Sequence, residues 1–125
     1  MLDPSYVNAI LVSTMNDLPG YEVTHVYGEV FGLVVRSRHM FSNIGASFRT
    51  IFGGEVRGYT DLLTTTRHEA VGRLRHEAAS VGANAILMMR FDTGVFAGVM
   101  NEVAAYGTAV SVRPIAASGD TAPSL

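Results

Sequence analysis

The pattern of apolar and polar positions changes period between residues 58 and 92. From Tyr59 onward, apolar or small residues recur at steps of three and four, which places one stripe along an α-helix: Leu63, Thr66, Ala70, Leu74, Ala78 and Val81. Gly82 follows this stripe, and glycine readily adopts the left-handed conformation that ends a helix. Residues 86–92 are too short and too apolar to form a surface helix. The pattern therefore predicts a long amphipathic helix followed by a buried strand.

A first long strand is predicted over residues 21–35. Its alternation places Val26, Val30 and Val34 on one face, and it leaves the other face to a second apolar set: Tyr27, Phe31, Leu33 and Val35. Since both faces are apolar in the second half, we expect both to be covered. Gly28 and Gly32 inside this strand indicate a bulge or the close approach of another backbone.

A third strand is predicted over residues 102–112, and residues 93–100 are predicted to be a connection. The even positions of the strand are large and are expected to pack on the long helix: Tyr106, Val110 and Val112. The odd positions are small, which permits close packing against a neighbouring element or subunit: Ala105, Gly107, Ala109 and Ser111. Pro114 ends the strand because proline has no N–H group to donate.

The predicted order is strand, short helix, long helix, strand, strand. The short helix is assigned to residues 41–52 from the spacing of four large apolar residues: Phe41, Ile44, Phe48 and Phe52. Residues 1–10 are expected to be a flexible leader, although residues 10–12 are apolar enough for a short strand, and residues 114–125 a disordered tail. Residues 11–113 then form one α+β domain, in which one long helix covers a three-stranded antiparallel sheet in two layers.

One helix covers only one face of such a sheet, so the other face needs a partner. Apolar residues make up 48% of the 125-residue chain and charged residues only 16%, which predicts more apolar surface than a monomer can bury. The simplest partner is a second copy of the chain, and we expect a homo-oligomer.

Charge and cysteine content exclude several classes of function. The formal net charge of -2 gives no attraction to nucleic acid or to an anionic membrane. The absence of cysteine excludes disulfides and thiolate metal sites. Neither a signal peptide nor an apolar run of about 18 residues is recognisable, so a cytoplasmic protein is expected.

Seven short motifs, in order along the chain, resemble the YbjQ family, which is also described as a heavy-metal-binding domain. The resemblance covers residues 11 to 112 and consists of Asn16-Asp17-Leu18-Pro19-Gly20-Tyr21, Val35-Arg36-Ser37-Arg38-His39, Gly53-Gly54-Glu55, Gly58-Tyr59-Thr60, Gly82-Ala83-Asn84-Ala85, Arg90-Phe91-Asp92 and Tyr106-Gly107-Thr108-Ala109-Val110. It implies a dodecin-like subunit that assembles as a homopentamer. The chain departs from the family pattern at Asn43, where an acidic residue is common.

The histidines do not form a recognisable metal site within one chain. His39 follows Arg36 and Arg38, which disfavour a nearby cation, and His68 and His76 lie two helical turns apart. No paired-histidine or cysteine motif is present. The cofactor is therefore unknown; a divalent metal held by symmetry-related residues of an oligomer is one hypothesis, and solvated surface histidines are the other.

Two groups of charged residues are candidates for binding or assembly. Those at the end of the first strand and around the glycine turn suit a small carboxylate or phosphate: Arg36, Arg38, His39, Glu55 and Tyr59. The competing interpretation is that these arginines pair with Glu55, Glu69 or Asp92 across a subunit boundary.

The second group lies on the long helix and the strand after it, and is interpreted as ion pairs or interface clamps: Arg67, Glu69, Arg73, Glu77, Arg90 and Asp92. No nucleophile with an adjacent base is present, so no catalytic residue is assigned. The sequence favours a homo-oligomeric binding or assembly module. The alternative is an enzyme that acts on a small anionic substrate at a subunit boundary.

Overall fold

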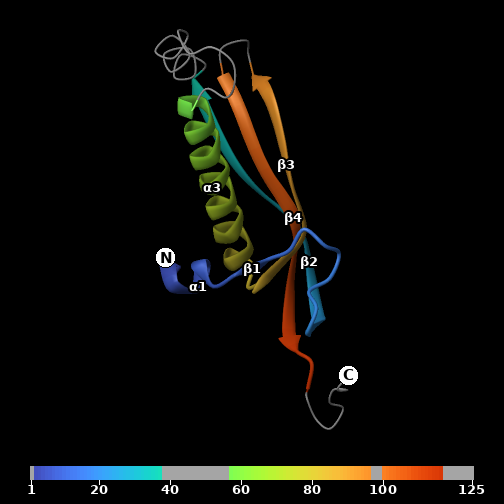
Figure 1. The fold of residues 1–125 in the computed structure, drawn as a ribbon. Coiled ribbons are helices and arrows are strands. Elements are labelled where there is room, and N and C mark those ends of the chain that lie inside the picture. The colour runs from blue at the N-terminus through green and yellow to red at the C-terminus, as the bar shows by residue number, and fades with distance from the viewer. Residues whose placement is uncertain (1, 38–56, 97–99, 117–125) are drawn as a thin grey trace.

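The structure, a computed structural model, describes residues 2–37, 57–96 and 100–116. One long helix lies along one face of a twisted sheet (Figure 1). The elements are α1 (Pro4–Asn8), β1 (Leu11–Val12), β2 (Tyr21–Ser37), α3 (Arg57–Ser80), β3 (Ala85–Phe96) and β4 (Met100–Pro114). The α+β prediction is confirmed. The helix predicted over residues 41–52 lies outside the described residues.

The sheet has four strands in the order β1-β3-β4-β2, so the prediction of a three-stranded antiparallel sheet is wrong. β4 pairs antiparallel with both β2 and β3, whereas β1 pairs parallel with β3 through Leu11↔Ala85 and Val12↔Ile86. A strand of two residues is too short to show a period. The sheet is therefore mixed, and β2 forms one edge.

The N-terminal residues are ordered by local capping and by a contact with the helix end. Asp3 precedes α1 and its side chain accepts a hydrogen bond from the Ser5 N–H, while proline occupies the first helical turn. The Tyr6 hydroxyl donates to the Ala83 carbonyl at 2.7 Å. These contacts hold α1 beside the C-terminal end of α3.

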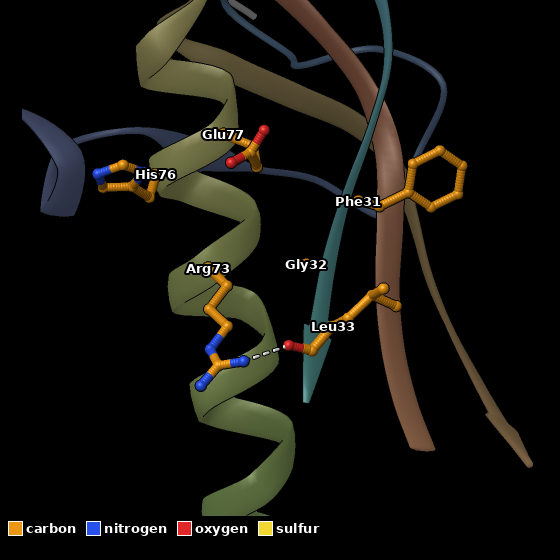
Figure 2. A pocket seen from close by; sticks show the side chains of 6 residues that line it. All are labelled: Phe31, Gly32, Leu33, Arg73, His76 and Glu77. Carbon is orange, nitrogen blue, oxygen red and sulfur yellow. Dashed lines mark hydrogen bonds between the residues drawn. The ribbon is translucent and has the colours of Figure 1, made fainter. Parts of the chain in front are cut away.

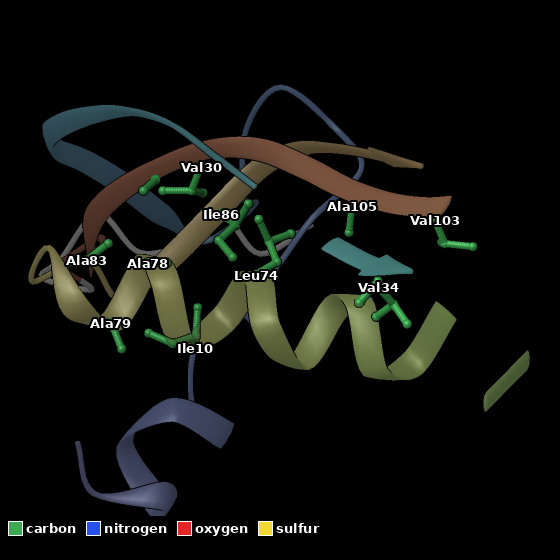
Figure 3. Packing of buried hydrophobic residues seen from close by; sticks show 12 residues of the cluster. Ile10, Val30, Val34, Leu74, Ala78, Ala79, Ala83, Ile86, Val103 and Ala105 are labelled. Carbon is green, nitrogen blue, oxygen red and sulfur yellow. The ribbon is translucent and has the colours of Figure 1, made fainter. Parts of the chain in front are cut away.

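α3 covers the sheet with the predicted stripe, whose centre is fully buried: Thr66, Ala70, Leu74 and Ala78. Leu63 and Val81, at the ends of the stripe, are exposed. Gly82 ends the helix with a φ of 91°, as the sequence predicts. The core packs this stripe against Val30, Val34, Ile86, Val103, Ala105 and Ala109 (Figure 3).

The prediction for the two faces of β4 is reversed. Ala105 and Ala109, from its small-residue face, lie in the core against α3. Tyr106 is exposed, and Val110 and Val112 belong to a second cluster with Ala85, Leu87 and Leu18. Small side chains allow the helix backbone to approach the sheet closely, so the small face meets the helix. The prediction that residues 93–100 form a connection is wrong for most of them. β3 extends to Phe96, and β4 begins at Met100.

The two glycines within β2 have the two effects that the sequence predicts. Gly28 has a φ of 114° and lies at a register shift between Val26 and Gly28, which is a bulge. A β-carbon at Gly32 would overlap backbone atoms of Ala70 and Leu74 on α3. β2 and α3 are therefore in direct backbone contact.

Candidate functional site

The charged residues of α3 form two rows, one on each side of its buried stripe. One row consists of Glu69, Arg73 and Glu77, which recur every four residues. This row lies on the side of α3 that faces β2, as the contacts of Glu69 and Arg73 with residues of that strand show. Arg67 and Arg75 lie on the other side. Arg67 sits over the Phe91 ring of β3 at 5.2 Å, and Arg75 donates to the Ile10 carbonyl. The helix therefore presents different charges to the two sides of the sheet.

Arg36, Glu69 and Arg73 form a chain of ion pairs between β2 and α3. Arg36 donates to Glu69 Oε1, and Arg73 Nη2 donates to Glu69 Oε2 at 2.9 Å. Arg73 Nη1 also donates to the Leu33 carbonyl at 2.6 Å. The side chains of Arg36 and Glu69 are 24% and 34% exposed, so this pair is only partly screened by water. It joins the end of β2 to the helix within one chain.

An open hollow of about 300 Å³ lies between the edge strand and the helix, next to this ion-pair chain. It is lined by Phe31, Gly32, Leu33, Arg73, His76 and Glu77 (Figure 2). Arg73 already has two acceptors, whereas the side chains of His76 and Glu77 make no hydrogen bond or ion pair within the described part of the chain. The hollow thus offers one imidazole and one carboxylate to a ligand or a neighbouring molecule.

The predicted ligand-binding group is only partly visible. Arg38, His39 and Glu55 lie outside the described residues. Tyr59 belongs to α3, but only its backbone is described. Arg36 pairs with Glu69. Among the residues that the structure describes, the group contributes one arginine that already has a carboxylate partner.

The predicted ion-pair group separates into two parts. Glu69 and Arg73 join the pair with Arg36. Arg90 instead donates to the Thr14 and Met89 carbonyls at 2.8 Å, which fastens residues 13–15 beside β3. Asp92 is exposed, with no ion pair among residues 2–37, 57–96 and 100–116. Arg67, Glu77 and Asp92 are therefore available to a partner.

The described side chains do not fit a heavy-metal site within one chain. No group of three or more histidine, aspartate or glutamate residues comes together in the described ranges, and the chain has no cysteine. His25 is stacked edge-on against Tyr27 at a ring distance of 4.4 Å. A transition metal needs several convergent nitrogen, sulfur or carboxylate ligands. These residues provide no such set.

The sequence interpretation missed the hollow, because its lining comes from two elements far apart in the chain. It assigned His76 to a solvated helix surface and Phe31 to a covered strand face. Two features of the sequence point to this place in retrospect. Gly32 indicates a close backbone approach, and Arg73 and Glu77 recur with helical spacing on one side of α3.

Comparison with known proteins gives consistent matches over nearly the whole domain. Residues 10–113 match a family model described as "Putative heavy-metal-binding". A UPF0145 protein of Mycobacteroides abscessus is 53% identical over 106 residues, which cover 85% of this chain and 99% of that protein. The UPF0145 protein YjfJ of Lactococcus lactis is 51% identical over 106 residues, with 85% and 97% covered.

A solved structure supports the fold. The crystal structure of a protein of unknown function from Pediococcus pentosaceus, assigned to the DUF74 family, is similar with a TM-score of 0.50 and 16% identity. The match covers 83% of this chain and 98% of that one.

Within the described ranges, no helix is both long and apolar enough to cross a bilayer.

Proposed function

We propose that this chain, which belongs to the YbjQ family of UPF0145 proteins, works in the cytoplasm as a homopentameric assembly module that binds a small ligand at its subunit boundaries. The observation that carries the proposal is that β2 is a long edge strand with an exposed apolar face. This strand of 17 residues forms an edge of the sheet, and its side chains on the face away from α3 are largely apolar and exposed.

The exposed apolar side chains of β2 lie on both sides of Glu29, and those after it adjoin Tyr106 of β4. The exposed members on the face away from the helix are Val23, Val26, Phe31, Leu33, Val35 and Tyr106. Phe31 and Tyr106 are cross-strand partners with a ring distance of 6.2 Å, so the patch spans two strands. Contiguous apolar patches on a soluble protein mark interaction surfaces, because burying them removes unfavourable contact with water.

The backbone of β2 supports the same conclusion. Long edge strands with unpaired N–H and C=O groups invite pairing with another chain, and proteins usually shorten, charge or cover them. β2 has charged residues at Glu22, Glu29 and Arg36 and a bulge at Gly28, but its segment 30–35 has neither a charge nor a bulge. The Arg73 contact satisfies only the Leu33 carbonyl.

The hollow beside β2 supports the choice of ligand. Its described polar side chains are Arg73, His76 and Glu77; the last two offer an imidazole and a carboxylate to a small polar molecule that donates hydrogen bonds, and they are too few for a transition-metal site. It opens at the β2 edge, so a neighbouring subunit bound there would form its remaining wall. The ligand site and the assembly contact would then be the same place.

Light scattering of the untagged full chain at micromolar concentration tests the assembly. We expect one species of about five times the chain mass of 13.4 kDa. A clean monomer would overturn the proposal. Elemental analysis after metal supplementation tests the class of ligand. We expect far less than one transition-metal ion per chain. One ion per chain would contradict the proposal that the site does not bind a transition metal.

A further inference from the structure

The hollow between β2 and α3 has one wall made of strand backbone. Val30 and Val34 of β2 lie in the core, so the alternate residues Phe31 and Leu33 direct their side chains to the other face of the sheet. Figure 2 shows the Phe31 ring turned away from α3. Gly32, between these two residues, has no side chain. A group that enters the hollow therefore meets peptide groups of the strand on one side and side chains of α3 on the other.

Hydrogen bonds within the sheet identify which peptide groups of β2 face this hollow. The Val110 carbonyl accepts from the Asn84 N–H, so Val110 and every second residue of β4 face β3. This set includes Ala104, whose register partner on β2 is Leu33. The N–H and C=O groups of Leu33 therefore point away from the sheet. Those of Phe31, two residues earlier on the same strand, point the same way.

At one end of the hollow, a guanidinium group joins the strand to the helix. Arg73 donates through Nη1 to the Leu33 carbonyl at 2.6 Å and through Nη2 to the Glu69 carboxylate at 2.9 Å. Leu33 belongs to β2, and Glu69 lies one helical turn before Arg73. A strand carbonyl and a helix carboxylate thus share one cation through charge-assisted hydrogen bonds.

A second pair of acceptors of the same kind lies at the other end of the hollow. Leu33 contacts Arg73, whereas Arg36, three residues further along β2, contacts a residue one turn earlier on α3. The strand and the helix therefore run in opposite directions. Two residues of a strand span about 6.6 Å and four residues of a helix span about 6 Å, so Phe31 is level with Glu77. Figure 2 shows these two residues at one end of the hollow.

This second pair has no cation in the described part of the chain. The Glu77 side chain makes no ion pair there, because Arg73 pairs back with Glu69 and not forward with Glu77. Within the same residues, no strand and no side chain donates to the outward carbonyl of Phe31. Figure 2 shows the Glu77 side chain on the side of α3 that faces the strand. Two acceptors are therefore level with each other, and the described chain provides no donor for either.

We infer that the ligand of this hollow carries a guanidinium group, which donates to the Glu77 carboxylate and to the Phe31 carbonyl. This inference rests on the proposed function and identifies the chemical class of its ligand. A planar guanidinium donates in two directions at once, as Arg73 does one turn away. A cation there also continues the alternation of negative and positive groups from Glu69 through Arg73 to Glu77. The hollow of about 300 Å³ has room for such a group.

A titration of the untagged full chain with methylguanidinium chloride, followed by saturation-transfer NMR of the probe methyl group, tests the inference. Because Glu77 is exposed, we expect a dissociation constant on the order of millimolar, which rises as sodium chloride is added. N-Methylurea is the matched probe, since it is planar and of similar size but uncharged. It should bind at least about tenfold more weakly. Equal binding of the two probes would overturn the inference.

A variant of the carboxylate locates the binding. Glu77→Gln keeps the size of the side chain and removes its charge, so it should weaken the binding of methylguanidinium at least about tenfold. Asp92→Asn removes an exposed carboxylate from β3 and should bind the probe as the wild type does. Circular dichroism and light scattering check that each variant is folded and assembled.

The outcomes separate this inference from the proposed function. If the wild type is an oligomer and Glu77→Gln binds methylguanidinium unchanged, the inference fails and the assembly stands. If Glu77→Gln dissociates the oligomer, a cation of a neighbouring copy occupies the hollow, and the inference of a small guanidinium ligand is also overturned. A monomeric wild type would end the proposed function itself.

Discussion

Gly32 of β2 lies directly against the Ala70 carbonyl of α3, so closely that a β-carbon at position 32 would overlap it and the Leu74 N–H group. This contact sets the distance between the helix and the edge strand. It also brings Arg73 within reach of the Leu33 carbonyl and Arg36 within reach of Glu69. The ion-pair chain and the hollow therefore depend on the absence of a side chain at one residue.

Gly32→Ala should destabilise the chain by about 1–3 kcal/mol or more, because the obstructing atoms are backbone and cannot rotate away. Chemical denaturation at fixed protein concentration measures the change in the free energy of unfolding. Gly94→Ala on β3 is the control, since a β-carbon there meets nothing within 4 Å. Equal stability of the two variants would show that β2 and α3 are not in backbone contact.

Glu69→Gln should cost about 1 kcal/mol of unfolding free energy, because it leaves Arg36 half-buried without a carboxylate. Glu22→Gln is the matched control. Glu22 pairs with Arg113 at 3.4 Å, and those side chains are 46% and 68% exposed. We expect no measurable change there. A larger loss for Glu22→Gln than for Glu69→Gln would contradict the assignment of the structural ion pair.

Leu74→Ala should cost about 2–5 kcal/mol, since Leu74 is the largest fully buried side chain of the core and its removal leaves a cavity. Leu63→Ala, on the exposed end of the same stripe, should change stability by less than about 1 kcal/mol. Thermal and denaturant unfolding of the two variants compare the positions directly. Similar losses would mean that Leu63 is buried in the assembled protein.

Phe31→Ser should weaken assembly by about tenfold or more, because it removes an aromatic ring from the centre of the exposed apolar patch. Dilution followed by sedimentation velocity measures the dissociation constant. Ile115→Ser is matched in exposure, at 54% against 53% for Phe31, but lies beyond the end of β4. It should leave assembly unchanged; an equal effect would remove the patch from the interface.

The long helix and the three long strands could be predicted from the sequence because each contains enough residues to show a period. The centre of the helical stripe, including Thr66 and Leu74, is buried as its spacing predicts. Alternation also separates the two faces of β4 correctly. It does not say which face meets the helix, and side-chain size misled the prediction: Tyr106 is large but exposed, and Ala105 is small but buried.

The site was harder to predict because it depends on contacts between segments that are distant in the chain. Arg36 and Glu69 are separated by 33 residues, and only the close approach at Gly32 brings them together. β1 has only two residues and pairs with β3 through backbone atoms, so no alternating pattern of side chains reveals it in the sequence. The position of β2 at one edge of the described sheet follows from the strand order, which the local pattern does not determine.

Native mass spectrometry of the untagged full chain tests the central claim most directly, because it counts the subunits in each assembly. We predict one dominant species of five chains, each of 13.4 kDa, that dissociates only on strong activation or dilution. A spectrum that contains only the single chain at micromolar concentration would contradict the account.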